Sequence, residues 1–233
     1  MSSVADRLDE VRARLARAAE DARRPPNAIT LLAVSKFQPE AAIREAYAAG
    51  QRDFGENYAQ ELAEKAEALA DLNDLRWHMI GHLQRNKARQ VVRYASCVHS
   101  AHSVELVQEL DKRRAPEAGK LTVLVEVNVG GEAQKSGCEP AAVAAVLDAV
   151  ESSARLTLGG LMCVPPHTED PAGARPFFEA LVRLREIHGG ERRLPALSMG
   201  MTADLEVAVA AGATIVRVGT AIFGERPRAG AGA

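Results

Sequence analysis

The sequence has few of the features that mark disulfide-rich, membrane or secreted proteins. Its three cysteines, Cys97, Cys138 and Cys163, are an odd number without a C-x-x-C pair, which argues against a disulfide framework or thiolate zinc site and for a reducing compartment. The longest stretch without Asp, Glu, Lys or Arg is only 13 residues, 156–168, whereas a membrane-spanning helix needs about 20 apolar residues. The first residues lack the basic and apolar regions of a secretory leader. The sequence therefore predicts a cytoplasmic protein that does not span a membrane.

The chain also lacks an excess of either charge. Its 29 Lys and Arg residues are matched by 31 Asp and Glu residues, so the formal net charge is -2 over 233 residues. Surfaces that bind nucleic acid are usually strongly basic, so nucleic acid is not expected as the main partner. Apolar residues make up 47% of the chain and charged residues 26%, a balance typical of a globular domain with ample material for a core.

Short runs rich in β-branched residues alternate with longer segments of helical periodicity. An apolar stripe with spacings of three and four residues predicts a first helix at about 3–22. Eight strands are then predicted at residues 29–34, 52–55, 76–80, 96–100, 121–127, 156–162, 195–199 and 214–218. Helices are predicted between them at residues 39–49, 58–69, 84–92, 104–112, 140–150, 171–187 and 203–210.

This alternation predicts an α/β protein with parallel strands, because each return to the sheet needs a crossover. Eight units indicate a single-domain (β/α)8 barrel of the TIM type with an extra N-terminal helix. A doubly wound open sheet is the competing architecture. No linker or change in composition marks a second domain, so we expect one domain over residues 1–233. The barrel is expected at about 27–224, where the last strand leads only into Ala221-Ile222-Phe223-Gly224, and a flexible tail is expected at about 226–233.

In such a barrel, functional residues lie at the carboxyl ends of the strands. Lys36 ends the first predicted strand, and Asn57 is the polar residue just past the second. Apolar surroundings lower the pKa of a lysine and favour the neutral amine that forms a Schiff base with an aldehyde. Pairing of Lys36 with a carboxylate at the barrel rim is the alternative interpretation.

The last two strands lead into segments rich in glycine and hydroxyl residues. These segments are Ser198-Met199-Gly200-Met201-Thr202 and Val218-Gly219-Thr220. Loops at these positions often bind phosphate, through free backbone amides, hydroxyl groups and the close approach that glycine permits. Either segment alone is also compatible with an ordinary turn. Together, and opposite Lys36, they indicate a phosphorylated aldehyde, with pyridoxal 5'-phosphate (PLP) as the obvious candidate.

The position of Arg217 indicates which chemistry such a ligand can support. It lies two residues before Gly219, so both share a face of the last strand, with Arg217 deeper and beside the expected pyridine ring. A guanidinium can only donate, and so suits an unprotonated ring nitrogen. An aspartate there would instead keep the ring protonated and strongly electron-withdrawing. This arrangement disfavours most carbanion chemistry and leaves racemisation at best. An arginine paired with a carboxylate inside the barrel is the alternative.

The histidines do not form a convincing metal-binding pattern. His78 and His82 are four residues apart, and His99 and His102 are three apart. The first pair spans a strand end rather than a helix, and no acidic third ligand has suitable spacing. We therefore expect no metal site and interpret these histidines as structural or as part of the barrel rim.

Three basic residues, Arg85, Arg89 and Arg93, follow one another at intervals of four and so share a helix face. This face would suit nucleic acid or an acidic partner. A solvated helix at the barrel rim is the favoured interpretation, and salt-sensitive binding of a nucleic acid would argue for the alternative.

Seven motifs, in order along the chain, resemble those of the YggS/PROSC family of pyridoxal phosphate homeostasis proteins. They are AVSK at 33–36, FGENY at 54–58, WHMIGHLQRNK at 77–87, EAQKSG at 132–137, GLM at 160–162, SMGM at 198–201 and RVGTAIFG at 217–224. The resemblance covers about residues 27–226. It implies a barrel like the N-terminal domain of bacterial alanine racemase and PLP as cofactor.

The resemblance also implies roles for individual residues. Lys36 would form the internal aldimine, Arg217 would be the partner of the pyridine nitrogen, and Asn57 would be a polar contact near the cofactor. The implied phosphate contacts are Ser198, Gly219 and Thr220, and Met199 and Gly200 complete the predicted cofactor-binding set.

Racemases with this barrel need a second base, a tyrosine supplied by a separate β-domain and a partner subunit. The chain ends about ten residues after the predicted barrel, and none of its three tyrosines, Tyr47, Tyr58 and Tyr94, follows the barrel. With no evident second base, we expect no catalytic residues. The predicted protein is a monomeric PLP carrier or regulator that buffers the vitamer and supplies it to PLP-dependent apo-enzymes. The alternatives are a PLP-dependent amino-acid racemase or an aldolase, although aldolases usually carry their lysine on the sixth strand.

Overall fold

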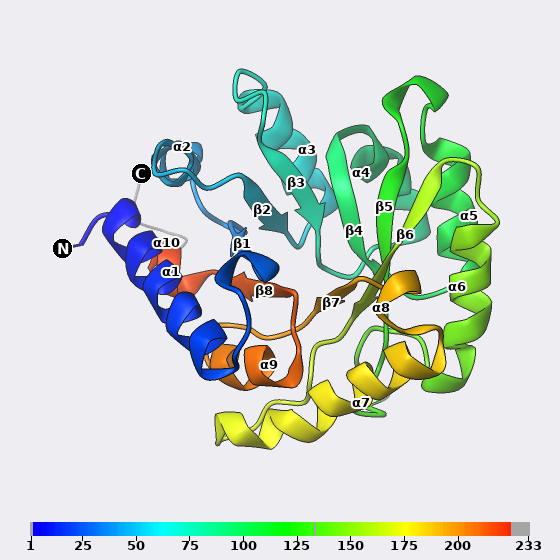
Figure 1. The fold of residues 1–233 in the computed structure, drawn as a ribbon. Helices are drawn as coiled ribbons and strands as arrows, with labels where there is room; N and C mark the ends of the chain where they lie inside the picture. The colour runs from blue at the N-terminus through cyan, green and yellow to red at the C-terminus, as the bar shows by residue number, and fades with distance from the viewer. Residues whose placement is uncertain (1, 133, 225–233) are drawn as a thin grey trace.

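Eight parallel strands close into a barrel in the computed structural model, which describes residues 2–132 and 134–224 (Figure 1). The strands are β1 (Thr30–Val34), β2 (Asp53–Glu56), β3 (Arg76–Met79), β4 (Ala95–Ala101), β5 (Leu121–Glu126), β6 (Leu156–Met162), β7 (Ala196–Ser198) and β8 (Ile215–Val218). Neighbouring strands pair in chain order, and β1 also pairs with β8. This last pairing confirms the (β/α)8 barrel and excludes an open sheet.

Helices cover the outside of the barrel. They are α1 (Val4–Asp21), α2 (Glu40–Ala48), α3 (Ala59–Ala68), α4 (Ala88–Tyr94), α5 (Val104–Arg113), α6 (Val143–Glu151), α7 (Arg175–Ile187), α8 (Gly190–Arg193), α9 (Leu205–Ala211) and α10 (Thr220–Phe223). Each predicted strand and helix occurs, with boundaries shifted by a few residues. The predicted helices at 84–92, 140–150 and 171–187 open with a 3-10 turn before α4, α6 and α7.

The N-terminal helix takes the place of a full helix after the last strand. Helix α1 begins at a capping box in which Ser3 and Asp6 each accept a hydrogen bond from the other's backbone amide. Its buried stripe, which includes Leu8 and Val11, faces α2, α9 and α10. In Figure 1 the blue α1 lies beside the orange-red α9 and α10, although most of the chain separates them in sequence. The extra helix therefore completes the outer layer where β8 meets β1.

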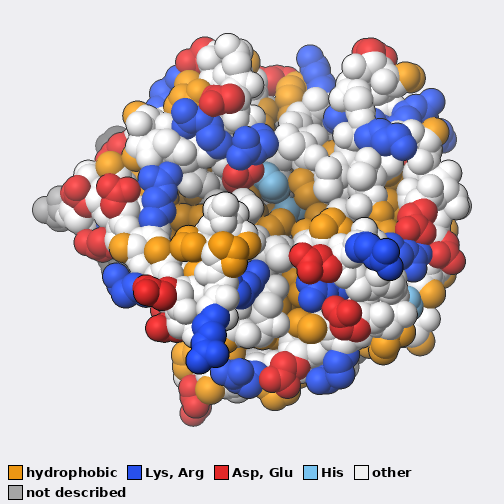
Figure 2. Space-filling view, in the orientation of Figure 1, with side chains coloured by type: hydrophobic (Ala, Val, Ile, Leu, Met, Phe, Trp, Pro, Cys, Tyr) orange, Lys and Arg blue, Asp and Glu red, His pale blue; other side chains and the backbone are white. Residues whose placement is uncertain are grey.

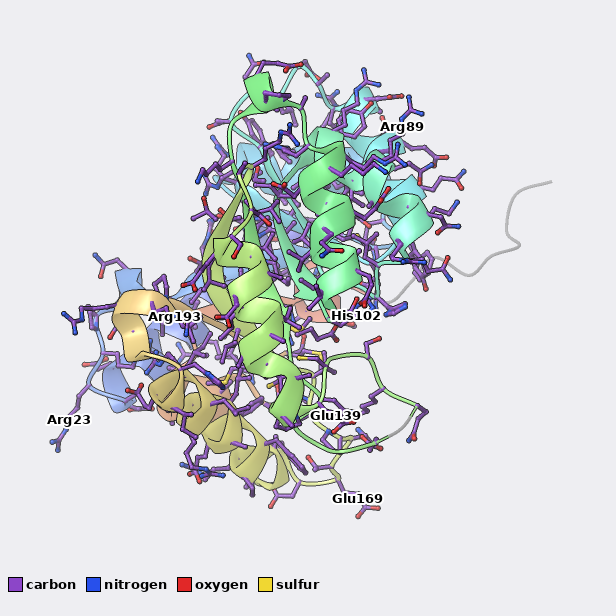
Figure 3. All side chains as sticks on the ribbon, turned by 90° about the vertical axis from the view of Figure 1, so that its right-hand side faces the viewer. Arg23, Arg89, His102, Glu139, Glu169 and Arg193 are labelled. Carbon is purple, nitrogen blue, oxygen red and sulfur yellow. The ribbon has the colours of Figure 1, made fainter. Side chains whose placement is uncertain are left out.

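Two single-turn helices, α8 and α10, do not occur among the predicted elements. The sequence predicts no helix after the last strand, where α10 is found. A four-residue helix is too short to show a 3.6-residue periodicity, which explains why neither was predicted. Arg193 of α8 pairs with Asp148 and Glu151 of α6 on the side of the barrel shown in Figure 3. The predicted tail at 226–233 lies outside the described residues.

The barrel interior contains polar as well as apolar side chains. Its strands are buried on both faces, as expected for a parallel sheet covered by helices. A small apolar cluster of Cys97, Leu124 and Met162 lies apart from the large core. His99 on β4 contacts Ser198 on β7, and because these strands are not neighbours, their contact must cross the interior. Within the described residues, no helix is both long enough and apolar enough to cross a lipid bilayer.

Candidate functional site

A cavity of about 450 Å³ opens at the carboxyl ends of the barrel strands. Five of the eight residues predicted to bind a cofactor line it, namely Lys36, Asn57, Arg217, Gly219 and Thr220. They follow or belong to β1, β2 and β8, so the topology brings together residues up to 184 positions apart in sequence. The volume lies in the range usual for small-molecule sites. Lys36, Arg217 and the Gly219-Thr220 turn thus share one cavity.

The surface around this end of the barrel is partly apolar. The opposite face, at the amino ends of the strands, is the one shown in Figure 2, where acidic and basic side chains are interspersed around a central hollow. Four exposed hydrophobic side chains stand on loops at the carboxyl ends of the strands: Phe37, Tyr58, Val164 and Met201. Val164 and Met201 also line the cavity. The rim therefore offers apolar contacts as well as polar groups.

A buried ion pair fixes the residue before Lys36. Lys65 Nζ on α3 lies 2.8 Å from Glu56 Oε1 and donates to the Ser35 carbonyl oxygen at 2.6 Å. The Ser35 hydroxyl donates to the same Glu56 oxygen at 2.7 Å. Burial raises the pKa of Glu56 to about 6, although Lys65 and Ser35 oppose the shift. These contacts tie the end of β1 to α3 and so hold the backbone that leads into Lys36.

The residue after Lys36 is held by the same helix. The Phe37 amide donates to Glu61 Oε1 at 2.6 Å, and that oxygen also accepts from Lys65 Nζ at 2.7 Å. Phe37 has φ +62°, a left-handed conformation that is costly for a bulky residue and persists only where surrounding contacts enforce it. Lys36 therefore sits in a turn that is anchored on both sides.

Asn57 contributes an unsatisfied polar atom. Its side-chain oxygen Oδ1 is buried and has no hydrogen-bond partner within the described chain. Buried polar atoms are almost always paired, so this oxygen is suited to a donor on a ligand. The loop after β3 packs directly on Asn57: a Cβ atom added to Gly81 would lie 2.2 Å from the Asn57 carbonyl oxygen. Because Gly81 has no side chain, the loop after β3 can pack this closely against the backbone of Asn57.

Arg217 is buried at the floor of the cavity with 4% of its surface exposed. Its Nη1 donates to Ser198 Oγ at 2.7 Å, and its Nη2 donates to the Cys163 carbonyl oxygen at 2.9 Å. Among the described residues no carboxylate lies within ion-pair distance, so the alternative of a paired arginine is not observed. Burial lowers the pKa of Arg217, but the ordinary value is so high that the group stays charged at neutral pH.

The segment after β7 lies only partly in the cavity. Ser198 is fully buried, and its hydroxyl lies between Arg217 and His99 beneath the cavity. Met199 is buried in the core, and the Gly200 carbonyl accepts from the Arg217 amide at 3.0 Å. These three residues do not line the cavity, whereas Met201, Thr202 and Ala203 do. The contacts of Ser198, Met199 and Gly200 with a cofactor stay predictions, and the cavity wall itself is formed by the next residues of the loop.

Several further residues of the site are not among those predicted from the sequence. Ile80 and Val164 add apolar walls at the ends of β3 and β6, and they could have been found by extending the strand-end rule to apolar residues. The Glu56–Lys65 pair had a weaker signal, a glutamate inside the FGENY motif followed by a lysine nine residues later. Glu126 on β5 is buried near Arg217, and burial raises the pKa of its carboxyl to about 7.

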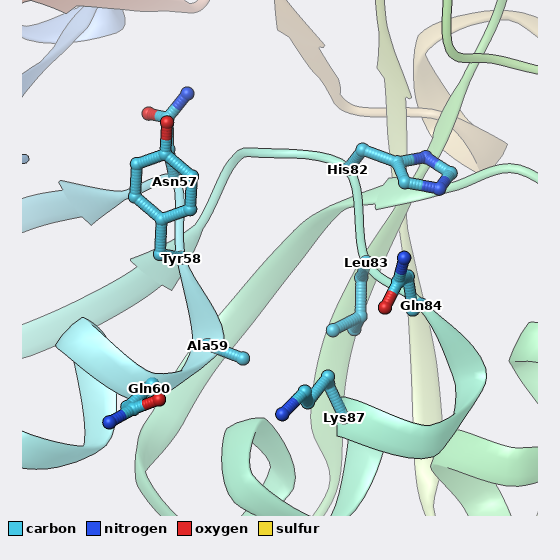
Figure 4. Close-up of a pocket in the computed structure, with 8 residues that line it drawn as sticks. All are labelled: Asn57, Tyr58, Ala59, Gln60, His82, Leu83, Gln84 and Lys87. Carbon is cyan, nitrogen blue, oxygen red and sulfur yellow. The ribbon is translucent and has the colours of Figure 1, made fainter.

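A second cavity of about 400 Å³ adjoins the first and shares Asn57 with it. It lies between the start of α3 and the loop after β3. Figure 4 shows the amine of Lys87 facing the space between these elements, with Gln84 and His82 on the same side. The His82 ring stacks on His102 at 4.7 Å between centroids. The candidate site therefore extends from the barrel axis toward the rim.

Three possible metal donors, His78, Cys97 and His99, approach one another inside the barrel. Their ligand atoms all lie within 4.8 Å of one another. However, His78 Nδ1 and His99 Nε2 are already hydrogen-bonded to each other at 2.9 Å. Burial raises the pKa of the Cys97 thiol far above its usual range, which disfavours the thiolate that binds metals. The two histidines are thus better described as part of a hydrogen-bond network.

Comparisons with known proteins agree over nearly the whole chain. The sequence pattern of the alanine racemase N-terminal domain matches residues 7–227. A pyridoxal phosphate homeostasis protein of Pseudomonas aeruginosa is 46% identical over 227 residues, which cover 97% of each chain. A protein of the same name from Aquifex aeolicus is 43% identical, and the match covers 95% of this chain and 97% of the relative. Another from Escherichia coli is 41% identical, with 97% of this chain and 98% of the relative covered.

Solved structures show the same relationship. The structure of PipY from Synechococcus elongatus with PLP bound has a TM-score of 0.81 and 37% identity, and the match covers 95% of this chain and 100% of PipY. An alanine racemase from Streptomyces coelicolor has a TM-score of 0.70 at 21% identity and is matched over 59% of its length. At that identity the racemase shares the fold alone.

Proposed function

The chain belongs to the alanine racemase N-terminal domain family and, within it, to the pyridoxal phosphate homeostasis proteins, and from this premise we propose that it binds PLP reversibly at Lys36 and keeps it as a reserve. The observation that supports this most is the single cavity shared by Lys36, Arg217 and the Gly219-Thr220 turn. The aldehyde of the bound vitamer would react with the amine of Lys36. The PLP-bound structure of the relative PipY supports the same ligand.

The donor set suits each part of the ligand. Lys36 offers the amine, and Arg217 offers N–H donors deeper in the cavity for the ring nitrogen. At the other end, Thr220 opens the single-turn helix α10, whose first amides have no acceptor within the helix. Gly219 lets the backbone approach closely, since an added Cβ would lie 3.1 Å from the Val34 carbonyl oxygen. The unsatisfied oxygen of Asn57 fits a ligand hydroxyl or amine.

We propose further that the protein holds the vitamer without catalysing a reaction. Arg217 cannot give a proton to the ring nitrogen, and this limits the stabilisation of a carbanion. Of the tyrosines, Tyr47 on α2 donates to Asp74 in the loop after α3, and Tyr94 on α4 donates to Glu67 on α3, so both lie on the outer layer of the barrel. Burial raises the pKa of the Cys163 thiol to about 12, so at neutral pH it stays protonated and cannot act as a base. Tyr58, at the rim, is the tyrosine to examine for residual racemisation.

Release of the vitamer to apo-enzymes belongs to the same proposal. The half-exposed side chains of Phe37 and Tyr58, whose ring centroids are 5.3 Å apart, stand beside Lys36 at the open end of the barrel. Exposed apolar groups of this kind occur at contact sites for other proteins. They support transfer through direct contact at the barrel rim.

The proposal is tested by titrating PLP into the wild-type chain, Lys36→Ala and the control Lys112→Ala, which changes an exposed lysine on α5. We expect a new absorption band for the wild type and the control, and none for Lys36→Ala. Alanine racemisation is assayed on the same samples, and none above background is expected. A Lys36→Ala protein with the wild-type spectrum overturns the binding site. Turnover that needs both PLP and Lys36, and falls in Tyr58→Phe, supports a racemase instead.

A further inference from the structure

Five side chains inside the barrel form a continuous chain of hydrogen bonds. Arg217 Nη1 lies 2.7 Å from Ser198 Oγ, Ser198 Oγ is 2.9 Å from His99 Nδ1, His99 Nε2 is 2.9 Å from His78 Nδ1, and His78 Nε2 is 3.0 Å from Asp53 Oδ1. His78 is 8% exposed, and His99 and Ser198 are fully buried. The chain begins at the cavity and ends at the first residue of β2, at the opposite end of the barrel.

The two ends fix the direction in which the hydrogen atoms point. The guanidinium of Arg217 can only donate, and an ionised carboxylate at Asp53 can only accept. Burial alone would raise the pKa of Asp53, but hydrogen bonds from His78 and Arg76 outweigh it and keep the pKa below its usual range. Asp53 is therefore ionised at neutral pH, and His78 Nε2 is the donor to it.

If both imidazoles are neutral, the bond that His78 donates to Asp53 determines the position of every other hydrogen in the chain. Nδ1 of His78 has no hydrogen, so it accepts from Nε2–H of His99, and Nδ1 of His99 then accepts from the hydroxyl of Ser198. The Ser198 oxygen accepts from Arg217. Burial, helped by the nearby Arg217 charge, lowers the pKa of His99 well below its usual value and keeps it neutral.

This assignment of the hydrogens excludes a positively charged His78. A charged His78 would reverse both histidine hydrogen bonds, so that His99 and Arg217 would both donate to Ser198. The buried hydroxyl hydrogen of Ser198 would then have no acceptor among the described residues. A buried donor without an acceptor costs about 1–3 kcal/mol. The neutral chain, in contrast, uses every one of these donors and acceptors once.

We propose that Ser198, His99 and His78 are positioning residues, which carry a one-way chain of donated hydrogen bonds from Arg217 to Asp53 and so aim the guanidinium at the ring nitrogen of the bound vitamer. The part of this inference that concerns the vitamer rests on the proposed function. The part that concerns the hydrogen positions does not, because it follows from the protein alone. The assignment predicts one tautomer for each histidine, and these tautomers can be measured.

The first test measures the tautomers in the full-length protein without added ligand, by nitrogen-15 NMR of the imidazole rings. We expect His78 and His99 both to carry hydrogen on Nε2 and none on Nδ1. Hydrogen on Nδ1 of either ring overturns the proposal. This result is decisive whether or not the protein binds PLP, so failure of the proposed function leaves it intact.

The second test compares Ser198→Ala with Cys97→Ala, a matched truncation on β4. Cys97 is also buried in the barrel interior but belongs to the apolar cluster and not to the chain. For Ser198→Ala we expect mixed tautomers at His99, a shifted absorption band for bound PLP and about tenfold weaker PLP binding, since a hydrogen bond to a charged group is lost. Cys97→Ala keeps the wild-type tautomers and spectrum.

Equal effects of the two variants on spectrum and affinity overturn the positioning role and leave only a packing role. Ser198→Thr keeps the hydroxyl and is expected to restore the His99 tautomer and most of the spectrum. If Ser198→Ala does not fold, the wild-type tautomers and the Ser198→Thr spectrum decide the question. A wild-type protein with the expected tautomers and no affinity for PLP would refute the proposed function but not the hydrogen-bond chain.

Discussion

The ammonium group of Lys65 donates to the carbonyl oxygen of Ser35 at 2.6 Å, across the interface between α3 and the end of β1. Lys65 is held there by Glu56 and Glu61, at 2.8 and 2.7 Å. Glu61 in turn accepts from the amide of Phe37. A charged cluster outside the barrel wall therefore fixes the peptides on both sides of Lys36, and the position of Lys36 depends on a buried lysine that does not line the cavity.

Replacing Lys65 should damage folding more than replacing a surface cation. Lys65→Met leaves the fully buried Glu56 carboxylate without its partner, so we expect a loss of about 3–5 kcal/mol in the free energy of unfolding. The control is Arg44→Met, which breaks the exposed pair with Asp71 and should cost less than about 1 kcal/mol. Urea unfolding measures both.

The double variant Lys65→Met/Glu56→Gln should recover part of the lost stability, because no buried charge is then left unpaired. If Lys65→Met and Arg44→Met lose the same stability, the cluster does not have the role described above.

Thr220 offers a test of the phosphate end. Thr220→Val keeps the shape of the side chain and removes the hydroxyl, so we expect about tenfold weaker binding of PLP. Pyridoxal, which lacks the phosphate, serves as the control ligand and should bind both proteins equally. Fluorescence or absorbance titrations give the two dissociation constants. An equal loss for both ligands would show that Thr220 acts on the ring or on the fold.

Alanine substitutions at Gly81 and Gly55 compare a clash with backbone atoms and a clash with side-chain atoms. An added Cβ at Gly81 meets the backbone of Asn57 at 2.2 Å, whereas at Gly55 it meets the flexible ends of Ile80 and Leu32 at 3.0 Å or more. Gly81→Ala should therefore cost about 1–3 kcal/mol of stability and weaken PLP binding by displacing Asn57. Gly55→Ala should cost less on both counts. Thermal unfolding and PLP titration of the two variants check this order, and the reverse order contradicts it.

Glu126 should make stability depend on pH. Burial raises the pKa of its carboxyl from 4.5 to about 7 in the folded protein, although Arg217 opposes the shift. Between these values the folded state keeps a proton that the unfolded state has lost, so the contribution of Glu126 to stability falls as the pH rises through this range. The loss is about 3 kcal/mol at most.

Glu126→Gln cannot ionise, so its stability relative to the wild type should increase from pH 4.5 to pH 8. The control is Glu139→Gln, which changes an exposed carboxyl on the loop before α6 (Figure 3) and should show no such trend. Urea unfolding at both pH values measures the difference. A constant difference between Glu126→Gln and the wild type would mean that Glu126 is ionised throughout.

The sequence is sufficient for the fold because its signals are local. Each buried strand is a short apolar run, each long helix has an amphipathic stripe, and their order implies parallel pairing. The alternation of side chains on β8 also explains why Arg217 and Gly219 both reach the cavity. The single-turn helices α8 and α10 lack any such local signal.

The parts of the site that could not be predicted depend on contacts between distant strands. Ser198 ends β7, but whether its hydroxyl faces the cavity or Arg217 is decided by a neighbour on β8 and by His99 across the barrel. In the same way, the pairing of Lys65 with Glu56 depends on how α3 packs on β2. No spacing in the sequence contains this information.

The attachment point of PLP is the central claim, and reduction with borohydride followed by peptide mapping tests it most directly. The chain has six lysines, and Lys135 also lies on a loop after a strand. After incubation with equimolar PLP and reduction, we expect one adduct per chain by intact mass, on the peptide that contains Lys36. An adduct on Lys135 or on any other lysine, or no adduct at all, would contradict the account.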